Sequence, residues 1–372
     1  MIQPASNVFR GRRVLITGHT GFKGSWLALW LRQLDAEVYG YALEPPTNPS
    51  NFVVSGVRDV LADHVVGDIR DASRLHAAVR DAAPELIVHL AAQPLVRRSY
   101  QVPRETFDVN VLGVATLLDT VRALDTRCAV IVATSDKCYE NLETGRRYRE
   151  TDRLGGRDPY SASKAAAEVI VEAYRHSFFP VDRISEHGIR LATVRAGNVI
   201  GGGDWAEGRI LPDAARALSA GQALRIRSPN AVRPWQHVLD ALSGYLALSA
   251  KLLTSDDPHW CDAWNFGPAD EAWLTVAELI EIFHNAYGAG TCKIGCDASR
   301  LHEAKTLQLN VEKAQTELGW QPSWTAIDAT IRTALWYKRF YEQVAAGPSF
   351  MRATCEQELA EYQTPATLQA SS

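Results

Sequence analysis

The first forty residues alternate between apolar and amphipathic runs. Residues 14–18 read VLITG, an apolar run of β-forming residues, and a glycine-rich turn follows them. Residues 25–36, SWLALWLRQLDA, place apolar positions at helical spacing, and residues 37–44, EVYGYALE, return to a strand pattern. The order of strand, turn, helix and strand predicts a βαβ unit at the start of the chain.

The same alternation continues to residue 201. Short apolar runs at 64–71, 86–93, 129–136 and 188–201 are separated by helical segments such as 75–84 and 110–124. Strands that are apolar throughout are typical of sheets with helices on both faces. Residues 1–200 are therefore predicted to form an α/β domain with a doubly wound parallel, Rossmann-type sheet.

The pattern loosens after Gly201, where glycine, proline and tryptophan become frequent. We expect a smaller C-terminal substrate-binding lobe from residues 201–233 and 259–363, while the helical segment 234–258 returns to the first domain. The tail 364–372 is small and polar, and we expect it to be disordered.

Composition narrows the possible partners. With 372 residues the chain is long enough for two domains, and 46% hydrophobic with 22% charged residues is ordinary for a soluble globular protein. A formal charge of -4 gives no broad basic surface for nucleic acid, so a small molecule is the expected partner. Without a secretory signal or an apolar run of ~18 residues, we expect a cytoplasmic protein with no membrane contact.

The six cysteines are scattered, and only Cys292 and Cys296 lie close together. Because no second cysteine or histidine pair stands at ligand spacing, we expect free thiols and no metal site.

The segment TGHTGFKG places Gly18, Gly21 and Gly24 between the first strand and its helix. Glycines there permit a tight turn and let the backbone approach a pyrophosphate, which the free N–H groups of a helix start stabilise. The spacing differs from the standard fingerprint, but the position at the opening of a βαβ unit is the required context. The loop predicts a dinucleotide site formed by Thr17, Gly18, Thr20, Gly21, Phe22, Lys23 and Gly24.

The end of the second strand bears on the choice of cofactor. An acidic residue there holds the ribose of NAD, whereas NADP favours an arginine. Here the position is Ala42, with Glu44 two residues on and no basic residue in YALEPPTN. NAD is favoured, with a weak ribose contact or one from Glu44. Asp68, after the third strand, is a candidate for the adenine amino group or a solvated turn residue.

Tyr160 and Lys164 stand four residues apart at the head of an alanine-rich run. On a helix this spacing puts a phenol and an ammonium on one face. Such a pair is common on solvated helix faces, but this one follows a dinucleotide loop and the strand ends LAAQ and TSDK. That order favours a proton-transfer pair.

With these motifs in this order, the chain resembles the extended short-chain dehydrogenase/reductase family over nearly its whole length, in the branch that acts on nucleotide sugars. The stretches TGHTGFKGSWLALWL, YALEPPTNPS, GNVIGGGDW and RPWQHVLDAL resemble the 4,6-dehydratases of that branch that act on CDP-glucose. The resemblance implies an NAD-dependent lyase that makes a 4-keto-6-deoxy sugar for lipopolysaccharide O-antigen type biosynthesis.

The resemblance also implies the catalytic roles. Tyr160 is the base for the sugar 4-hydroxyl, and Lys164 holds the nicotinamide ribose and, with the oxidised nicotinamide, favours the phenolate. Ser135 bonds the 4-oxygen, and Asp136 is the acid for the departing 6-hydroxyl. Lys137 stands where many relatives carry glutamate, and is expected to be the base at C5, since a partly desolvated lysine near other cations can lose its charge. The alternative is that Asp136 and Lys137 are a solvated strand-end pair.

Further contacts are carried over from the same resemblance, together with a homodimer formed through a helix pair. Arginines suit a diphosphate because the guanidinium donates two parallel hydrogen bonds, although a structural arginine is the alternative at each position. The implied cofactor residues are Asp68, Ile69, Leu90, Ala91, Ala92 and Thr134, and the implied substrate residues are Gln93, Asn198, Arg209, Arg233 and Glu303.

Three other functions stay open. The fold and cofactor would also suit a 4,6-dehydratase of dTDP-glucose or GDP-mannose, a nucleotide-sugar 4-epimerase, or a non-catalytic NAD(P)-sensing protein. An epimerase needs no acid and base for dehydration, so Asp136 and Lys137 argue against it. A sensing protein need not keep Tyr160 and Lys164, so that pair argues against the last.

Overall fold

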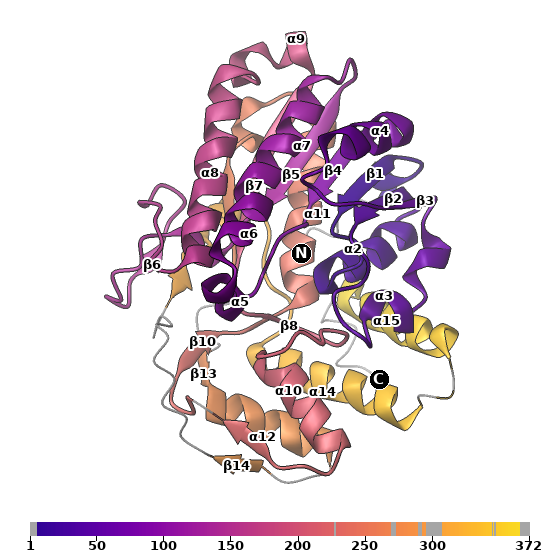
Figure 1. The fold of residues 1–372 in the computed structure, drawn as a ribbon, viewed down its shortest axis with the longest axis vertical. Helices are drawn as coiled ribbons and strands as arrows, with labels where there is room; N and C mark the ends of the chain where they lie inside the picture. Colours follow the sequence, from indigo (N-terminus) through magenta and orange to yellow (C-terminus); the bar gives the residue numbers. More distant parts are fainter. Residues whose placement is uncertain are drawn as a thin grey trace.

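A parallel sheet forms the centre of the molecule (Figure 1). The computed structural model describes residues 6–226, 228–268, 273–288, 292–294, 307–343, 345 and 347–364. In this part of the chain the sheet has seven strands in the order β12-β7-β5-β4-β1-β2-β3, all parallel. The order reverses between β1 and β4, so the predicted doubly wound α/β fold is confirmed. The strands are β1 (Arg13–Thr17), β2 (Glu37–Ala42), β3 (Asp63–Val66), β4 (Leu86–His89), β5 (Cys128–Ala133), β7 (Ile189–Ala196) and β12 (Ala263–Phe266).

Helices cover both faces of the sheet, which explains the apolar strands. In β1, Val14 and Ile16 join the core beneath α2 (Phe22–Gln33) and α11 (Val238–Thr254). The intervening Leu15 joins the opposite core with α4 (Ala72–Ala82), α7 (Gly113–Arg122) and α8 (Pro159–Ser177). Because successive side chains point to opposite faces and both faces are covered, each position of β1 after Arg13 is buried.

The start of α8 is fixed by local sequence. The Asp158 carboxylate accepts a hydrogen bond from the Ser161 amide at 2.9 Å, and Pro159 occupies the first helical position. An aspartate cap followed by proline is a strong helix start. Tyr160 therefore lies in the first turn of α8, with Lys164 one turn further along.

A smaller lobe lies beyond the carboxyl ends of the central strands (Figure 1). Capping boxes at Thr275 and Thr325 begin its helices α12 and α14. Its main elements are α10 (Ile210–Ser219), β9 (Leu224–Ile226), β10 (Val232–Pro234), β13 (Trp273–Thr275), α12 (Val276–Tyr287), β14 (Cys292–Ile294) and α14 (Ala326–Glu342).

Two segments assigned to the lobe from sequence lie against the main domain instead. β12 pairs with β7 and buries Trp264 and Phe266, because the edge of β7 offers backbone partners to a short apolar run. α15 (Pro348–Gln363) packs on α2 and α3 (Asn51–Val54), and Arg352 donates to the carbonyls of Ser55 and Gly56. Thr364 bonds to the end of α15, and the rest of the expected tail lies outside the described residues.

Shorter elements connect these layers. They are α1 (Ser6–Phe9), η1 (Val57–Val60), α5 (Val96–Gln101), α6 (Pro103–Phe107), η2 (Asp108–Leu112), η3 (Asp136–Cys138), β6 (Arg147–Tyr148), η4 (Val181–Arg183), α9 (Ile184–His187), β8 (Val199–Ile200), β11 (Gln236–His237), η5 (Pro258–Trp260), β15 (Gln308–Leu309) and α13 (Glu312–Thr316).

Candidate active site

The glycine loop packs against the end of β4. Gly18 has φ +79°, and a Cβ there would lie 2.6 Å from the Ala91 amide nitrogen. A Cβ at Gly24 would lie 2.3 Å from the Gly18 carbonyl oxygen. Both positions require glycine on steric grounds. The structure thus brings the loop beside the predicted segment Leu90, Ala91 and Ala92.

Gly21 plays a different part in the loop. It caps α2 without any side-chain hydrogen bond, and a Cβ there would meet only the Gly18 carbonyl oxygen, at 3.3 Å. The first amides of a 12-residue helix thus face an open cradle of glycines. Free helix N–H groups beside such a cradle fit a pyrophosphate, so the residues present suit a dinucleotide.

Several other predicted cofactor residues have defined contacts in the structure. The Thr17 hydroxyl lies 2.7 Å from His89 Nδ1, and the Thr20 hydroxyl donates to the Leu43 carbonyl at 2.9 Å. Hydrogen bonds from Arg70 hold the pKa of Asp68 below its usual range. Ile69 lies against Gly113.

Sequence analysis missed a histidine pair beneath the loop. His19 Nε2 lies 2.7 Å from His64 Nδ1, and the His19 ring packs where a side chain on Gly40 would stand. Burial, with the charge of His64, lowers the pKa of His19 to about 3, so its ring is neutral. No local pattern around either residue indicates this contact, because the two residues are 45 positions apart.

Tyr160 and Lys164 are both buried on the face of α8 that meets β5. Lys164 Nζ donates to the Ala133 carbonyl at 3.1 Å, and burial lowers the pKa of Lys164 to about 8. The Ser135 side chain, directly after β5, acts on the Tyr160 phenol and lowers its pKa, against the larger effect of burial. The structure thus joins the predicted catalytic pair to the predicted strand end.

The charges that act on Tyr160 differ from the expectation. Burial raises the pKa of Tyr160, and the largest opposing charge comes from Lys137, with a further contribution from Arg209. The sequence predicts that Lys164, with the oxidised nicotinamide, favours the phenolate. The Lys164 ammonium donates to the Ala133 carbonyl. The cations that lower the pKa of Tyr160 are Lys137 at the strand end and Arg209 in the lobe.

Asp136 is not a solvated residue. Its side chain is 2% exposed, and Oδ1 accepts hydrogen bonds from the Ser135 hydroxyl at 2.7 Å and from Lys137 Nζ at 3.4 Å. Oδ2 is buried without a hydrogen-bond partner among the described residues. The alternative of a solvated strand-end pair is therefore wrong for Asp136, whereas the Lys137 side chain is 27% exposed.

Lys23 belongs to the same cluster. Its Nζ donates to the Tyr245 hydroxyl of α11 at 3.3 Å. Burial and the charges of Arg209, Lys164 and Lys137 lower the pKa of Lys23 to about 7, opposed by Asp136. Four cations thus act around one buried carboxylate, where an anionic substrate or cofactor would be stabilised.

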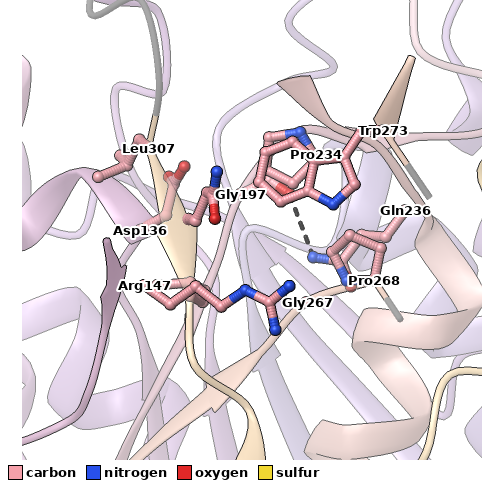
Figure 2. A pocket seen from close by; sticks show the side chains of 11 residues that line it. Asp136, Arg147, Gly197, Pro234, Gln236, Gly267, Pro268, Trp273 and Leu307 are labelled. Carbon is pink, nitrogen blue, oxygen red and sulfur yellow. Dashed lines mark hydrogen bonds between the residues drawn. The ribbon is translucent and has the colours of Figure 1, made fainter. Parts of the chain in front are cut away.

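A pocket opens between Asp136 and the lobe (Figure 2). The view shows the Arg147 side chain reaching across it from β6, and the Trp273 ring on the opposite side. Gln236 donates to the Gly197 carbonyl at 3.1 Å and so holds the floor of the pocket. The lining residues are Asp136, Arg147, Gly197, Pro234, Gln236, Gly267, Pro268, Trp273, Leu307, Gln308 and Leu309.

Three of the predicted substrate residues lie beside the cation cluster or next to residues of the pocket wall. Arg209 donates to Asp204 Oδ2 at 2.6 Å and acts electrostatically on Tyr160 and Lys23. Asn198 adopts φ +51° directly after Gly197, and Arg233 precedes Pro234 of the pocket wall.

Two further predicted substrate residues are not seen at the pocket. The side-chain nitrogen of Gln93 donates to the Thr106 hydroxyl, and its side-chain oxygen accepts from the Leu95 backbone N–H. Both polar atoms of the side chain are thus engaged within the loop. Glu303 lies outside the described residues.

The described residues offer neither a metal site nor a membrane-spanning helix. Among the described residues, no group of histidine, cysteine and acidic side chains could hold a metal ion. The four cysteines whose side chains are described, Cys128, Cys138, Cys261 and Cys355, are buried free thiols. Within the same part of the chain, the helices are too short or too polar to cross a bilayer.

Comparison with known proteins agrees with this geometry. The family model described as GDP-mannose 4,6 dehydratase matches residues 15–333. A CDP-glucose 4,6-dehydratase from Salmonella typhimurium strain LT2 is 45% identical over 332 residues, which cover 89% of this chain and 92% of that protein. A dTDP-glucose 4,6-dehydratase from Xanthomonas campestris pv. campestris is 28% identical and covers 87% of this chain and 92% of its own.

Solved structures share the fold. An epimerase, Mth375, from Methanothermobacter thermautotrophicus superposes with a TM-score of 0.77 at 20% identity, covering 92% of this chain and 96% of its own. A dTDP-glucose 4,6-dehydratase from Bacillus anthracis, solved in complex with NAD, gives 0.70 at 22% identity, covering 89% of this chain and 97% of its own. By the family match and the 45% identity, the chain belongs to the GDP-mannose 4,6 dehydratase family, in the nucleotide-sugar branch of the extended short-chain dehydrogenase/reductases.

Proposed function

We propose that this protein is a CDP-glucose 4,6-dehydratase, a hydro-lyase that converts CDP-D-glucose to CDP-4-dehydro-6-deoxy-D-glucose and water. The observation that carries the proposal is the buried strand end Ser135, Asp136 and Lys137 beside the phenol of Tyr160. An acid and a base next to an oxidation site are what elimination of water requires. The choice of CDP-glucose follows the 45% identity to the Salmonella enzyme.

The cofactor is NAD, held by the glycine cradle and the first amides of α2. When bound, NAD supplies a reversible hydride acceptor and donor. The loop residues Gly18, Gly21 and Gly24 leave room for its pyrophosphate, and Lys23 adds a positive charge nearby. Lys164 is the candidate for the nicotinamide ribose, and Thr134 for a further cofactor contact.

Tyr160 removes the proton from the sugar 4-hydroxyl during oxidation. The Ser135 side chain acts on the Tyr160 phenol, which supports assigning both hydroxyls to the same sugar oxygen. The positive charges of Lys137 and Arg209 favour the phenolate and oppose the effect of burial. When the hydride returns to C6, the phenol keeps its place as the hydrogen-bond partner of the 4-oxygen.

Asp136 and Lys137 divide the elimination. Once C4 is a ketone, the C5 proton is acidified, and Lys137 in its neutral form takes it. Asp136 in its protonated form donates to the 6-hydroxyl, which leaves as water while the C5–C6 double bond forms. The Lys137 proton then returns to C5. Before elimination, Lys137 gives its proton to Asp136 across the 3.4 Å contact between Nζ and Oδ1, which leaves the lysine neutral and the carboxyl protonated. After the hydride has returned, the proton that Tyr160 took from the 4-hydroxyl passes through the Ser135 hydroxyl, 2.7 Å from Asp136, and restores the pair for the next turnover.

The sugar diphosphate is assigned to the lobe. Arg209 already acts on the cluster of cations, and Arg233 lies beside the pocket wall, so both suit bidentate phosphate contacts. Asn198, Gln93 and Glu303 stay predictions. The product is suited to deoxysugar biosynthesis of the lipopolysaccharide O-antigen type.

We also infer a homodimer in the cytoplasm. Large apolar side chains are exposed along α6 to α8, which supports pairing of these helices between two copies: Phe107 38%, Leu112 56%, Val169 57% and Phe178 42%. Light scattering after size exclusion tests this. The buried free thiols are in keeping with a reducing compartment.

One experiment tests the activity. The purified protein, supplied with NAD, is incubated with CDP-glucose, dTDP-glucose, UDP-glucose and GDP-mannose, and the alkaline ultraviolet absorbance of a 4-keto product is measured. We expect a product with CDP-glucose at a rate well above the others. If a 4-keto product forms only from another nucleotide sugar, that sugar is the substrate. If the C4 epimer forms without that absorbance, the protein is an epimerase and not a dehydratase.

A further inference from the structure

A buried carboxylate links the catalytic helix to the sheet behind the site. Glu168 lies on α8, four residues after Lys164, and therefore one turn away on the same face. Its Oε1 accepts hydrogen bonds from the Thr134 hydroxyl and from Arg195 Nε at 2.9 Å. Its Oε2 accepts from Arg195 Nη2 at 2.8 Å and from the Thr193 hydroxyl at 2.9 Å. Both carboxylate oxygens are thus fully engaged.

The partner of Glu168 is equally engaged. Arg195 is buried on β7 and pairs with the carboxylate through two nitrogens. Its remaining Nη1 donates to the Tyr139 hydroxyl at 2.7 Å and to the Glu150 carbonyl at 2.9 Å. Burial alone would raise the pKa of Glu168, but the charge of Arg195 outweighs it and the pKa lies below its usual range. The carboxylate is therefore ionised.

The geometry shows what this ion pair holds. Lys164 binds the carbonyl of Ala133, and Glu168 binds the hydroxyl of the next residue, Thr134. Two side chains of α8, one turn apart, thus bind two consecutive residues at the end of β5. Ser135 and Asp136 follow immediately. The distance from the Tyr160 phenol to that pair depends on this double contact.

We propose that Glu168, ion-paired with Arg195, is a positioning residue of the active site, which fixes α8 against the end of β5 and keeps Lys164 charged. The proposal rests on the proposed function for its kinetic consequences. Neither residue touches the pocket, so each acts through Thr134 and Lys164.

The charge of Lys164 depends on several groups. Burial lowers its pKa to about 8, and the Glu168 carboxylate is the largest influence that raises it. The other titratable groups that face Lys164 are Cys138 on η3, His89 on β4 and Lys23 on α2. Removing the negative charge of Glu168 therefore lowers the pKa of Lys164, and the ammonium is lost at a lower pH.

The test uses Glu168→Gln, which keeps the shape and removes the charge, and Thr134→Val, which removes one contact and no charge. We expect Glu168→Gln to lower kcat about 10- to 100-fold at little change in KM, as for a small displacement of catalytic groups. Its alkaline pH limb should move to lower pH. Thr134→Val should lower kcat less than Glu168→Gln does, and the alkaline limb of its pH profile should stay at the wild-type pH.

Arg190→Met is the matched control. Arg190 stands at the other end of β7, is buried, and bonds to the Ser255 carbonyl and to Asp256. This variant should lose thermal stability and keep wild-type kcat and pH profile. A Glu168→Gln enzyme that behaves in the same way, with normal kcat and an unmoved limb, would show a purely structural residue and overturn the proposal.

A readout without substrate separates this proposal from the proposed function. NMR of ¹³C-lysine-labelled protein, with the Lys164 signal assigned through Lys164→Met, measures its titration directly. We expect Lys164 to titrate at lower pH in Glu168→Gln even if CDP-glucose is not the substrate. Should Glu168→Gln fail to fold, Thr134→Val carries the test, and an unchanged kcat in that variant contradicts the positioning role.

Discussion

Gly197 lies directly against the carboxylate of Asp136. A Cβ on Gly197 would stand 2.0 Å from Asp136 Cγ and 2.1 Å from Oδ2. Gly197 follows β7 and Asp136 follows β5, and these strands are neighbours in the sheet. Only the absence of a side chain at the end of β7 lets the carboxylate occupy its buried position.

Gly197→Ala should therefore displace the proposed acid. We expect the 4-keto product to form at least about tenfold more slowly, since misplacement of a catalytic group by about 1 Å is costly. Gly267→Ala is the control, because Gly267 lines the same pocket and a Cβ there meets Val311 at an ordinary 3.4 Å. Equal rates in the two variants would argue against a role for the Asp136 position.

Tyr160→Phe should lower turnover by about two to four powers of ten, as for the loss of a general base. The ring stays in its buried place, so circular dichroism and thermal melting should change little. Tyr174→Phe, on the same helix with its hydroxyl on Asp119, is the control and should be fully active. Near-normal turnover of Tyr160→Phe would remove it from the mechanism.

Lys137→Met should block elimination while oxidation at C4 continues, because oxidation depends on Tyr160. Reduced nicotinamide should then accumulate in stopped-flow absorbance, and exchange of solvent deuterium into C5 should stop. Lys137→Arg keeps the charge but cannot act as a base at neutral pH. If Lys137→Arg turns over normally, Lys137 contributes charge only and the base at C5 is another group.

Gly21→Val should weaken NAD binding and cost some stability. A Cβ at Gly21 would meet the Gly18 carbonyl oxygen at a tight 3.3 Å, and the rest of the side chain would obstruct what binds beside the helix start. Calorimetric titration with NAD measures the affinity, and thermal melting confirms the fold. Unchanged affinity would count against the loop as the pyrophosphate site.

Lys23 predicts a pH dependence of NAD binding. Its pKa is lowered to about 7, so the ammonium is present below this pH and is lost as the pH rises through it. If the ammonium faces the pyrophosphate, affinity should fall about fivefold between pH 6 and pH 8.5, the value of one partly screened charge. Lys23→Met should bind weakly and independently of pH, whereas Lys251→Met on the far part of α11 should behave as wild type. Affinity that rises with pH in the wild type would contradict this.

The sequence predicted those features of the fold that depend on the residues of a single element. Apolar runs of strand length, the glycine turn and the Asp158-Pro159 cap are local, so their spacing predicted the doubly wound sheet and put Tyr160 and Lys164 on one helix face. The sequence does not place the segment 263–266, because a four-residue run with three apolar residues does not indicate which strand it pairs with. Its place depended on the free edge of β7, which is formed by residues about 70 positions earlier.

The candidate site divides in the same way. The sequence by itself determined which residue types stand at the strand ends, since each motif lies within a few residues. Only the tertiary structure decided that Gly197 makes room for Asp136, that Lys23 turns to Tyr245 and that Glu168 binds Thr134. These contacts join different strands and helices, and the order of strands in the sheet sets them. Their effects on pKa depend on burial and distance, which are properties of the packed molecule and not of spacing along the chain.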